Sequence, residues 1–416
     1  MKCRFAPNRP LRKNRRDRNT TDDYVHFMGS LKHHRIALML NLQIGYCRRA
    51  IMGIAAYGRE RFWLLEDMPA QFDSIALVKE SSPDGIIAHV LDDRLGRALE
   101  RLNVPVVNLS SNQINLKLPT IDADQNAVGK MAAEYYWELG YQHYAYFGSA
   151  SAAFSRERED GYRSTLQRMK VSFDAMYLDY NLRPPFERDL QRAEEMVTRW
   201  LKELPKPVAI FCSNDEHSRF LSSLCQVGGI PVPESVAILG VDNDETMCLL
   251  SSPPLSSVDN PAEQIGYRAA AMLNRMISKG SKKTPSERVP PLCLIERAST
   301  ERFAAEDPLT RRAIAYIERN LKNPKFSVNT VAEHVGLSRR SLERTFAKQL
   351  GITVLAATQR ARVRNAKSLL RTSTLPINLI ASECGFSNHR RFGIVFRAST
   401  NMTPSAFRTY YDFDRL

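Results

Sequence analysis

Short apolar runs alternate with helical stretches from Arg35 to about residue 300, and this alternation limits the fold more than any other feature. The runs are Ile36–Leu40, Phe62–Leu65, Gly85–Ala88, Pro105–Leu109, Tyr144–Phe147, Val208–Cys212 and Val236–Val241. Alternation of strands and helices predicts parallel sheets with helices on both faces. Because seven or more units are too many for one small sheet, we predict an α/β domain of two doubly wound lobes over residues 31–300.

The strand pattern stops near Glu301–Pro308, and the rest of the chain is helical in character. We therefore predict a linker at 301–307 and an all-α domain at 308–416. Residues 1–30 are rich in Arg and Asn and lack apolar periodicity. They are predicted to be a basic, disordered arm, with a translation start at Met28 as the alternative.

Positive charge is concentrated at the C-terminal end. The chain has a net charge of +14, and residues 308–416 hold 19 Lys and Arg against 6 Asp and Glu. Residues 1–30 hold 8 against 3, so the stretch between them is mildly acidic. A basic domain beside a larger acidic one indicates that the basic domain binds a polyanion. Charge alone fits DNA, RNA or a membrane surface equally well.

The seven cysteines are scattered and form no CxxC pair. This favours reduced thiols in the cytoplasm, and we expect neither a disulfide framework nor a metal site. The sequence contains no apolar run of about 18 residues, so we predict no membrane-spanning helix. We find no GxxxxGK[ST], GxSxG or GxGxxG motif, so the sequence gives no positive sign of an enzyme or of a bound cofactor.

Residues Val328–Phe346 have the pattern of a helix-turn-helix. Apolar residues share one face of a first helix, Gly336 permits a sharp turn, and Ser338 is suited to cap a second helix. Leu342 and Phe346 continue the buried stripe of that second helix. Its outward positions are Arg339, Arg340, Glu343 and Arg344. Arg can bond guanine and Glu can accept from cytosine, so these residues are predicted to read DNA bases in the major groove.

The arrangement recurs about fifty residues later. A short helix at 376–384 is followed by Gly385, and Asn388 is suited to cap a second recognition helix. Phe392 and Phe396 repeat the buried stripe, and the outward residues are His389, Arg390 and Arg391. The segment Val354–Leu370 between the units is predicted to be one long helix. Its basic residues Arg360, Arg362, Arg364 and Lys367 are expected to be solvated or to touch phosphates.

This C-terminal region resembles the AraC/XylS family. The motifs that carry the resemblance are Ile380–Ser387, Phe392–Arg397 and Thr403–Arg408. The resemblance implies two helix-turn-helix units that bind a double-stranded DNA operator, with the residues named above in base-reading positions. It also implies that RNA polymerase is a partner. At Ile394 this chain departs from the polar or basic residue that members often carry.

Hydrogen-bonding side chains follow several of the predicted strands. Asn41 follows the first, His89 the third, Asn214 and Asp215 a later one, and Asp242 and Asn243 the last. Since ligands bind at the carboxyl ends of strands in such sheets, these residues are predicted to line a cleft that accepts a polyol. Tyr46 and Phe154 are candidates to stack on a sugar ring or to fill the core. Asp122 is predicted to cap a helix, and Glu296 and Arg297 to form hinge or surface pairs.

The same region is similar to the LacI/GalR and periplasmic sugar-binding fold. The matching segments are Ile121-Asp122, Arg158–Tyr162, Ser213–Asp215, Leu239–Asn243 and Ile295–Thr300. The resemblance implies that Arg158, Asn214, Asp215 and Asp242 line an effector cleft. His89 and Cys47 stand where acidic residues are expected.

Together the two resemblances imply a homodimeric, cytoplasmic activator of genes for the catabolism of a pentose, with D-xylose as the first candidate effector. Two alternatives stay open. Doubly wound lobes also host enzymes. The lobes could instead serve only to dimerise a DNA-binding protein, in which case DNA binding would not respond to any small molecule.

Overall fold

The computed structural model describes residues 33–411, apart from 111, 113–115, 180–186, 281–284, 301–306, 324–325, 351 and 401. The predicted arm at 1–30 and nearly all of the predicted linker at 301–307 lie outside these described residues.

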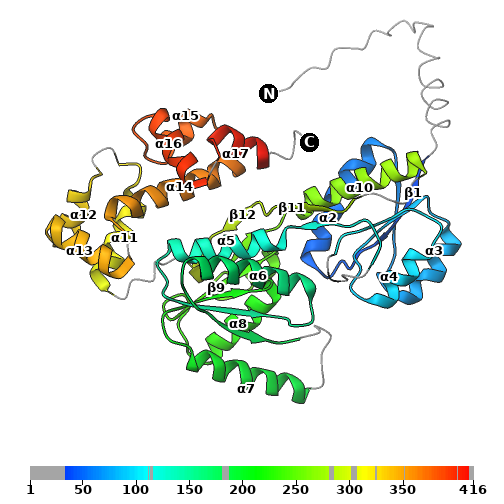
Figure 1. Cartoon of the computed structure of the whole chain (residues 1–416), viewed down its shortest axis with the longest axis horizontal. Coiled ribbons are helices and arrows are strands. Elements are labelled where there is room, and N and C mark those ends of the chain that lie inside the picture. Colours follow the sequence, from blue (N-terminus) through cyan, green and yellow to red (C-terminus); the bar gives the residue numbers. More distant parts are fainter. Residues whose placement is uncertain are drawn as a thin grey trace, which may run out of the picture.

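The first lobe is built on a parallel sheet in the order β2-β1-β3-β4 (Figure 1). Its strands are β1 (Arg35–Met39), β2 (Leu64–Asp67), β3 (Gly85–Ala88) and β4 (Val106–Asn108). Alternate β1 residues point to opposite faces. Ile36 and Leu38 pack with α2 (Gly45–Glu60) and α10 (Ala262–Lys279), and Ala37 and Met39 pack with α3 (Ile75–Ser81) and α4 (Asp93–Glu100).

The second lobe holds a six-stranded sheet in the order β12-β10-β9-β8-β6-β7. Its strands are β6 (His143–Gly148), β7 (Asp174–Tyr177), β8 (Val208–Cys212), β9 (Val236–Val241), β10 (Ser256–Asp259) and β12 (Cys293–Ile295), of which only β12 pairs antiparallel. Helices α5 (Gln125–Glu138) and α6 (Ala153–Arg168) cover one face, and α7 (Glu187–Glu203) and α8 (Asp215–Val227) cover the other. The prediction of two doubly wound lobes is confirmed.

The chain passes between the lobes three times. Strand β5 (Ile121–Ala123) belongs to the core of the first lobe and pairs with β11 (Glu287–Val289), whereas α5 belongs to the second. The other passages run from β10 to α10 and from β11 to β12. Residues at the ends of β5, β9 and β10 are therefore held between the lobes.

Glycines let the paired helices of each lobe approach closely. A Cβ at Gly53 of α2 would overlap the Glu263 carbonyl oxygen of α10, and a Cβ at Gly161 of α6 would overlap the Asn126 carbonyl oxygen of α5. Because Gly161 lies one turn from Arg158, the close approach of α6 to α5 also sets the depth of that arginine.

Seven helices make up the described part of the C-terminal domain. They are α11 (Pro308–Asn320), α12 (Val328–Val335), α13 (Arg339–Leu350), α14 (Val354–Thr372), α15 (Ile377–Glu383), α16 (His389–Thr400) and α17 (Pro404–Tyr411). Unit one is α12 and α13, and unit two is α15 and α16. Gly336 and Gly385 take positive φ at the two turns, as predicted. Ser338 and Asn388 accept hydrogen bonds from the backbone of Ser341 and Arg391, which confirms both predicted caps.

The two units differ in how they pack. Apolar residues of unit one, including Leu342, Phe346 and Leu350, belong to the same core as Tyr135 and Leu139 of the second lobe. Unit two has a core of its own, which contains Phe386, Phe392, Phe396 and Phe407. Unit one is therefore docked on the second lobe, and α14 extends from it to unit two.

Within the described residues, no helix is both long and apolar enough to cross a membrane. The six cysteines in this part of the chain are free and buried.

Candidate functional sites: an interlobe cluster and two recognition helices

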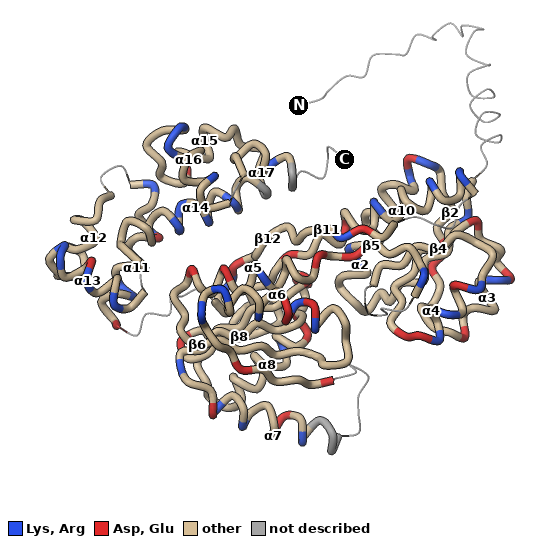
Figure 2. Tube along the Cα trace, in the orientation of Figure 1, with Lys and Arg blue, Asp and Glu red and all other residues tan. Residues whose placement is uncertain are grey.

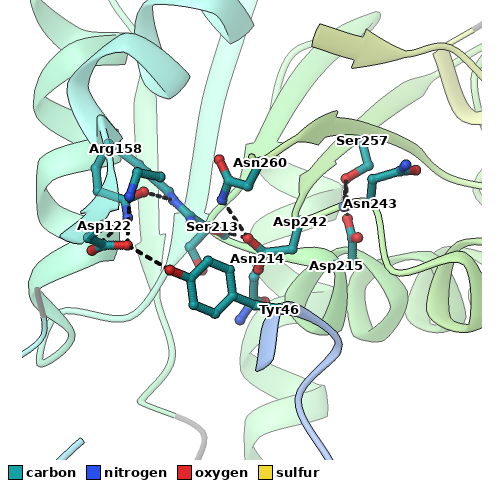
Figure 3. Close-up of polar contacts among 12 residues, drawn as sticks. Tyr46, Asp122, Arg158, Ser213, Asn214, Asp215, Asp242, Asn243, Ser257 and Asn260 are labelled. Atoms are coloured by element: carbon teal, nitrogen blue, oxygen red, sulfur yellow. Dashed lines mark hydrogen bonds and ion pairs between the residues drawn. The ribbon is translucent and has the colours of Figure 1, made fainter. Parts of the chain in front are cut away.

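Polar side chains from both lobes meet where the two lobes face each other (Figure 3). We call this group the interlobe cluster. It consists of Tyr46, His89, Asp122, Gln125, Arg158, Asp242 and Asn260. All except Asp242 are at least nine-tenths buried. Burying so many polar groups is costly unless each finds a partner, so their partners show how the site is built.

Arg158 links the two carboxylates of the cluster, Asp242 directly and Asp122 through Gln125. Its Nε donates to Oε1 of Gln125 at 2.7 Å, and a terminal nitrogen lies 3.4 Å from the Asp242 carboxylate. The other terminal nitrogen donates to the Ser213 carbonyl oxygen. The Phe154 ring lies 5.0 Å from the guanidinium, close enough for a cation–π contact. These contacts fix the orientation of a planar cation that carries five N–H donors.

Asp242 is presented by an unusual backbone. Asp242 and Asn243 both have positive φ, 99° and 49°, directly after β9. Such conformations are costly for residues with a Cβ, and they cluster at active sites and ligand clamps. Here the turn brings the Asp242 carboxylate to 2.6 Å from Nδ2 of Asn260.

Two buried polar atoms in the cluster lack a hydrogen-bond partner among the described residues, Nδ1 of His89 and Oδ1 of Asn260. Burial lowers the pKa of His89 to about 4, despite the opposing field of Asp122 and Asp242. The imidazole is therefore neutral at pH 7. Its ring centroid lies 5.7 Å from that of Tyr46, whose hydroxyl donates to the Leu109 carbonyl at 3.1 Å and lies 3.3 Å from Asp122. An unsatisfied buried group is a candidate to bond a ligand.

Direct bonds also tie the lobes together beside the cluster. Arg48 of α2 binds Asp244 at 2.8 Å, and Arg49 binds Asp259 at 2.6 Å and the Asp242 carbonyl at 2.9 Å. The backbone nitrogen of Ala153 donates to Asn112 at 2.9 Å. The described structure is thus one in which the lobes are in contact.

Four of the predicted cleft residues lie outside the cluster. Asn41 closes its own turn by accepting from the Gln43 nitrogen, and Asn214 caps α8 by accepting from the His217 nitrogen. The Asp215 carboxylate accepts from Ser257 and from the backbone of Asp244, and burial raises its pKa to about 8. Asn243 accepts from Arg297 at 2.7 Å. Figure 3 shows Asp215, Asn243 and Ser257 on the side away from Asp122 and Tyr46.

The sequence interpretation missed Gln125 and Asn260 and misassigned Asp122. The cap of α5 is Asp124, whose side chain accepts from the Ala127 nitrogen, so the prediction that Asp122 caps this helix is wrong. Instead Asp122 accepts from Gln125 at 3.2 Å. Asp122 and Asn260 each lie at or beside the end of a strand, β5 and β10. The rule used for Asp242 would have found Asn260, which follows β10, but not Asp122, which lies within β5.

Helix α13 exposes three of its four predicted base readers. Arg339, Arg340 and Arg344 are exposed, while Leu342 and Phe346 are buried. Glu343 is half-buried, and its carboxylate accepts from the Val354 nitrogen at 3.1 Å. Glu343 therefore holds the start of α14 in this structure.

Helix α16 exposes all three of its predicted readers, His389, Arg390 and Arg391. Figure 2 shows Lys and Arg along α13, α14 and α16. On α14, however, Arg364 is not a solvated or phosphate-facing residue as predicted. It binds Glu296 at 3.1 Å and Glu318 at 2.6 Å. Arg362 lies between the Phe326 and Phe386 rings, at 5.8 and 5.7 Å from their centroids.

Two family models match the chain. Residues 133–300 match a periplasmic binding protein-like domain, and residues 331–410 match a helix-turn-helix domain. The chain is also 31% identical to the xylose operon regulatory protein of Escherichia coli K12, across 91% of this chain and 97% of that protein. This chain belongs to the xylose operon regulatory protein family.

Solved structures and a second relative agree with this family. A xylose-binding transcription activator superposes with a TM-score of 0.59 at 29% identity, covering 91% of this chain and 98% of that one. The arabinose operon regulatory protein of Escherichia coli is 38% identical over 102 residues, which are 24% of this chain and 35% of that protein. Members of the xylose operon regulatory protein family are DNA-binding transcription regulators, and this chain has their sensor-like domain and their helix-turn-helix domain.

Proposed function

We propose that this chain activates genes of sugar catabolism when a pentose, D-xylose in the first instance, binds at the interlobe cluster. The printed names of its relatives, a xylose operon regulator and a xylose-binding activator, support this choice of sugar. The proposal is for a regulator rather than an enzyme. It places the sensor at 31–300, the linker at 301–307 and the DNA-binding domain at 308–416, and it has the protein act in the cytoplasm.

The interlobe cluster is the observation that carries the proposal. It offers carboxylate acceptors at Asp122 and Asp242, a fixed cation at Arg158, and unsatisfied atoms at His89 and Asn260. A polyol presents several hydroxyls, each of which both donates and accepts, so it can satisfy such a mixed set. An apolar ligand would leave these buried groups unpaired.

Access to the cluster requires the lobes to separate, because its side chains are almost entirely buried. In our proposal the sugar enters the open form and is enclosed when the lobes close, with Arg48–Asp244 and Arg49–Asp259 forming at closure. The sugar contacts both lobes only in the closed form, so it shifts the equilibrium toward that form.

For DNA, we propose that Arg339, Arg340 and Arg344 of α13 and His389, Arg390 and Arg391 of α16 contact operator bases, with Glu343 in a supporting role. The α14 helix has 19 residues, about 28 Å at 1.5 Å per residue. That length is comparable with one DNA turn of about 34 Å. We further propose that the active species is a homodimer that recruits RNA polymerase.

Calorimetry with pentoses and hexoses, combined with gel-shift titration with and without sugar, tests the proposal. Arg158→Ala and Asp242→Ala should each raise the sugar Kd at least about tenfold, because a charged hydrogen bond is worth about 1.5–3 kcal/mol. In both variants the sugar-dependent gain in DNA affinity should require at least about tenfold more sugar than it does in the wild type.

Asp93→Ala is the control, since its i,i+4 pair with Arg97 is more than half exposed and lies on α4, outside the cluster. It should leave sugar binding unchanged. Wild-type protein that binds no pentose or hexose would contradict the sugar-sensor proposal. If no sugar changes the DNA affinity, the result would favour the alternative in which the lobes serve only to dimerise the protein.

A further inference from the structure

Helix α16 carries an apolar position on a face that is otherwise basic. Ile394 is 63% exposed, whereas Phe392 and Phe396 of the same helix are fully buried in the core of unit two. Positions 390, 394 and 397 lie one turn apart, so Ile394 shares a face with Arg390 and Arg397, both exposed. A large aliphatic side chain therefore lies mostly in solvent between two arginines.

Gly393 beside it has no structural explanation within the described chain. It lies inside α16 with ordinary helical backbone, and a Cβ built on it would meet no described atom within 4 Å. Glycine is a poor helix former, and alanine would fit here without a clash. A missing side chain at this half-buried position, at the edge of the exposed face, allows another molecule to approach the backbone closely.

The corresponding position of unit one makes the contrast clear. The buried pair Leu342 and Phe346 of α13 matches Phe392 and Phe396 of α16, which places Arg344 opposite Ile394 and Glu343 opposite Gly393. On α16 an aliphatic side chain thus stands in place of Arg344, and a glycine stands in place of Glu343. The two helices are built to contact different chemical groups.

We propose that Gly393 and Ile394 form a thymine-methyl contact in the operator. The proposal rests on α16 being a DNA-reading helix, as set out above. The flanking arginines favour a polyanion, and a recognition helix meets DNA in the major groove. Within that groove the C5 methyl of thymine is the apolar group that a base pair presents, while the other features are hydrogen-bond donors and acceptors. Gly393 lets the helix backbone come close enough for Ile394 to cover that methyl.

Replacing thymine by deoxyuridine, one position at a time, tests this contact, because it removes the methyl and leaves base pairing intact. The duplex is one selected by the full-length protein from random sequences, and binding is measured with D-xylose present and absent. At one or two thymines the substitution should weaken wild-type binding roughly fourfold, which corresponds to the loss of one buried methyl. Ile394→Ala should weaken binding to the thymine duplex by a similar factor and be insensitive to deoxyuridine at those positions.

The Gly393→Ala variant distinguishes an effect on protein stability from an effect on the DNA contact. Alanine favours the helix, so the melting temperature of this variant should stay equal or rise while DNA affinity falls. Arg390→Ala tests the underlying assumption. If Arg390→Ala leaves DNA affinity unchanged, α16 does not read DNA and the proposed function fails at this helix.

If Arg390→Ala weakens binding but wild-type protein ignores every deoxyuridine, only the methyl contact is overturned. Ile394→Ala that keeps the deoxyuridine sensitivity of the wild type also overturns it. A change in oligomeric state with Ile394→Ala, without a change in the deoxyuridine profile, would make this face a protein contact and reject the proposal.

Discussion

Arg364 of α14 binds Glu296, the residue that follows β12, with 3.1 Å between Nε and Oε2. The same guanidinium binds Glu318 of α11 at 2.6 Å. Burial raises the pKa of the Glu296 carboxyl, although Arg364 acts in the opposite direction. Nearby, the Tyr135 hydroxyl lies 2.7 Å from the Thr300 hydroxyl. The helix that joins the two helix-turn-helix units is therefore bonded directly to the segment that leaves the sensor sheet.

Glu296→Gln should weaken communication between sugar and DNA. The variant keeps the size of the side chain but removes the charge that holds α14. We expect the sugar-dependent gain in DNA affinity, typically between about 5-fold and 150-fold for allosteric proteins, to fall at least threefold. Sugar affinity in the absence of DNA should stay within twofold of wild type. Gel-shift titration and calorimetry measure the two quantities.

Glu383→Gln provides the matched control for that experiment. Glu383 pairs with Lys322 on the surface of the same domain, and both side chains are largely exposed. Exposed pairs contribute little, so the gain with sugar should be that of the wild type. A Glu296→Gln protein with full coupling would show that the Arg364 contact is only structural.

Asn260→Ala should lower sugar affinity about tenfold, whereas Asn41→Ala should change it less than twofold. Asn260 has an unsatisfied buried oxygen and bonds Asp242, while the Asn41 side chain only closes a local turn. Both residues follow strands and look alike in sequence, so the pair distinguishes position in the cluster from residue type. Equal losses in the two variants would contradict the composition of the interlobe cluster.

His89 should make the sensor less stable in mild acid. Its folded-state pKa is about 4, below the unfolded value of about 6.5, so the unfolded chain binds the extra proton between these values. This residue has little effect above about pH 7, and between pH 7 and pH 5 it should cost about 2 kcal/mol. His89→Gln should lose that much less stability over the same interval.

Urea unfolding at pH 7 and pH 5 measures this difference. Trp63, Trp137 and Trp200, the three tryptophans of the chain, all lie in the two lobes, so their fluorescence follows the sensor. Parallel loss of stability in wild type and His89→Gln would mean that His89 titrates normally.

Arg340→Ala and Arg391→Ala should each cost about 1–3 kcal/mol on the operator and relax sequence preference at one position. Both side chains are exposed on recognition helices. Arg319→Ala, at the exposed end of α11, should change affinity little and specificity not at all. Binding-site selection with each variant gives the comparison. A uniform loss of affinity across all sequences would assign the two arginines to phosphates instead.

Much of the fold was predictable because most strands are continuous apolar runs. Gly85–Ala88, Val208–Cys212 and Val236–Val241 were predicted at their observed bounds. Strand β10 was missed because it reads Ser-Ser-Val-Asp, and its buried serines are satisfied by partners distant in sequence, such as Thr300 for Ser256. Polarity of this kind resembles a loop until the tertiary partners are known.

The positions of the sites in the fold were predictable, but several of the residues that form them were not. Arg158 and Asp242 meet as expected. In contrast, the Asn214 side chain caps the start of α8, and the Asp215 carboxylate accepts from the backbone of the loop at Asp244. Which side of a loop a side chain faces depends on backbone angles such as the positive φ of Asp242. The contact of Arg364 with Glu296 depends on how two domains dock, and helical periodicity carries no information about that.

If α13 and α16 read DNA as proposed, the fixed order of these two dissimilar helices on either side of α14 gives the DNA target of one chain a direction. A segment read by the arginines of α13 at one end and by α16 at the other has no internal two-fold symmetry. Reversing that segment relative to a promoter therefore turns the whole protein around. The sensor, bonded to α14 through Arg364, would keep its place relative to unit one but would face the opposite direction along the DNA.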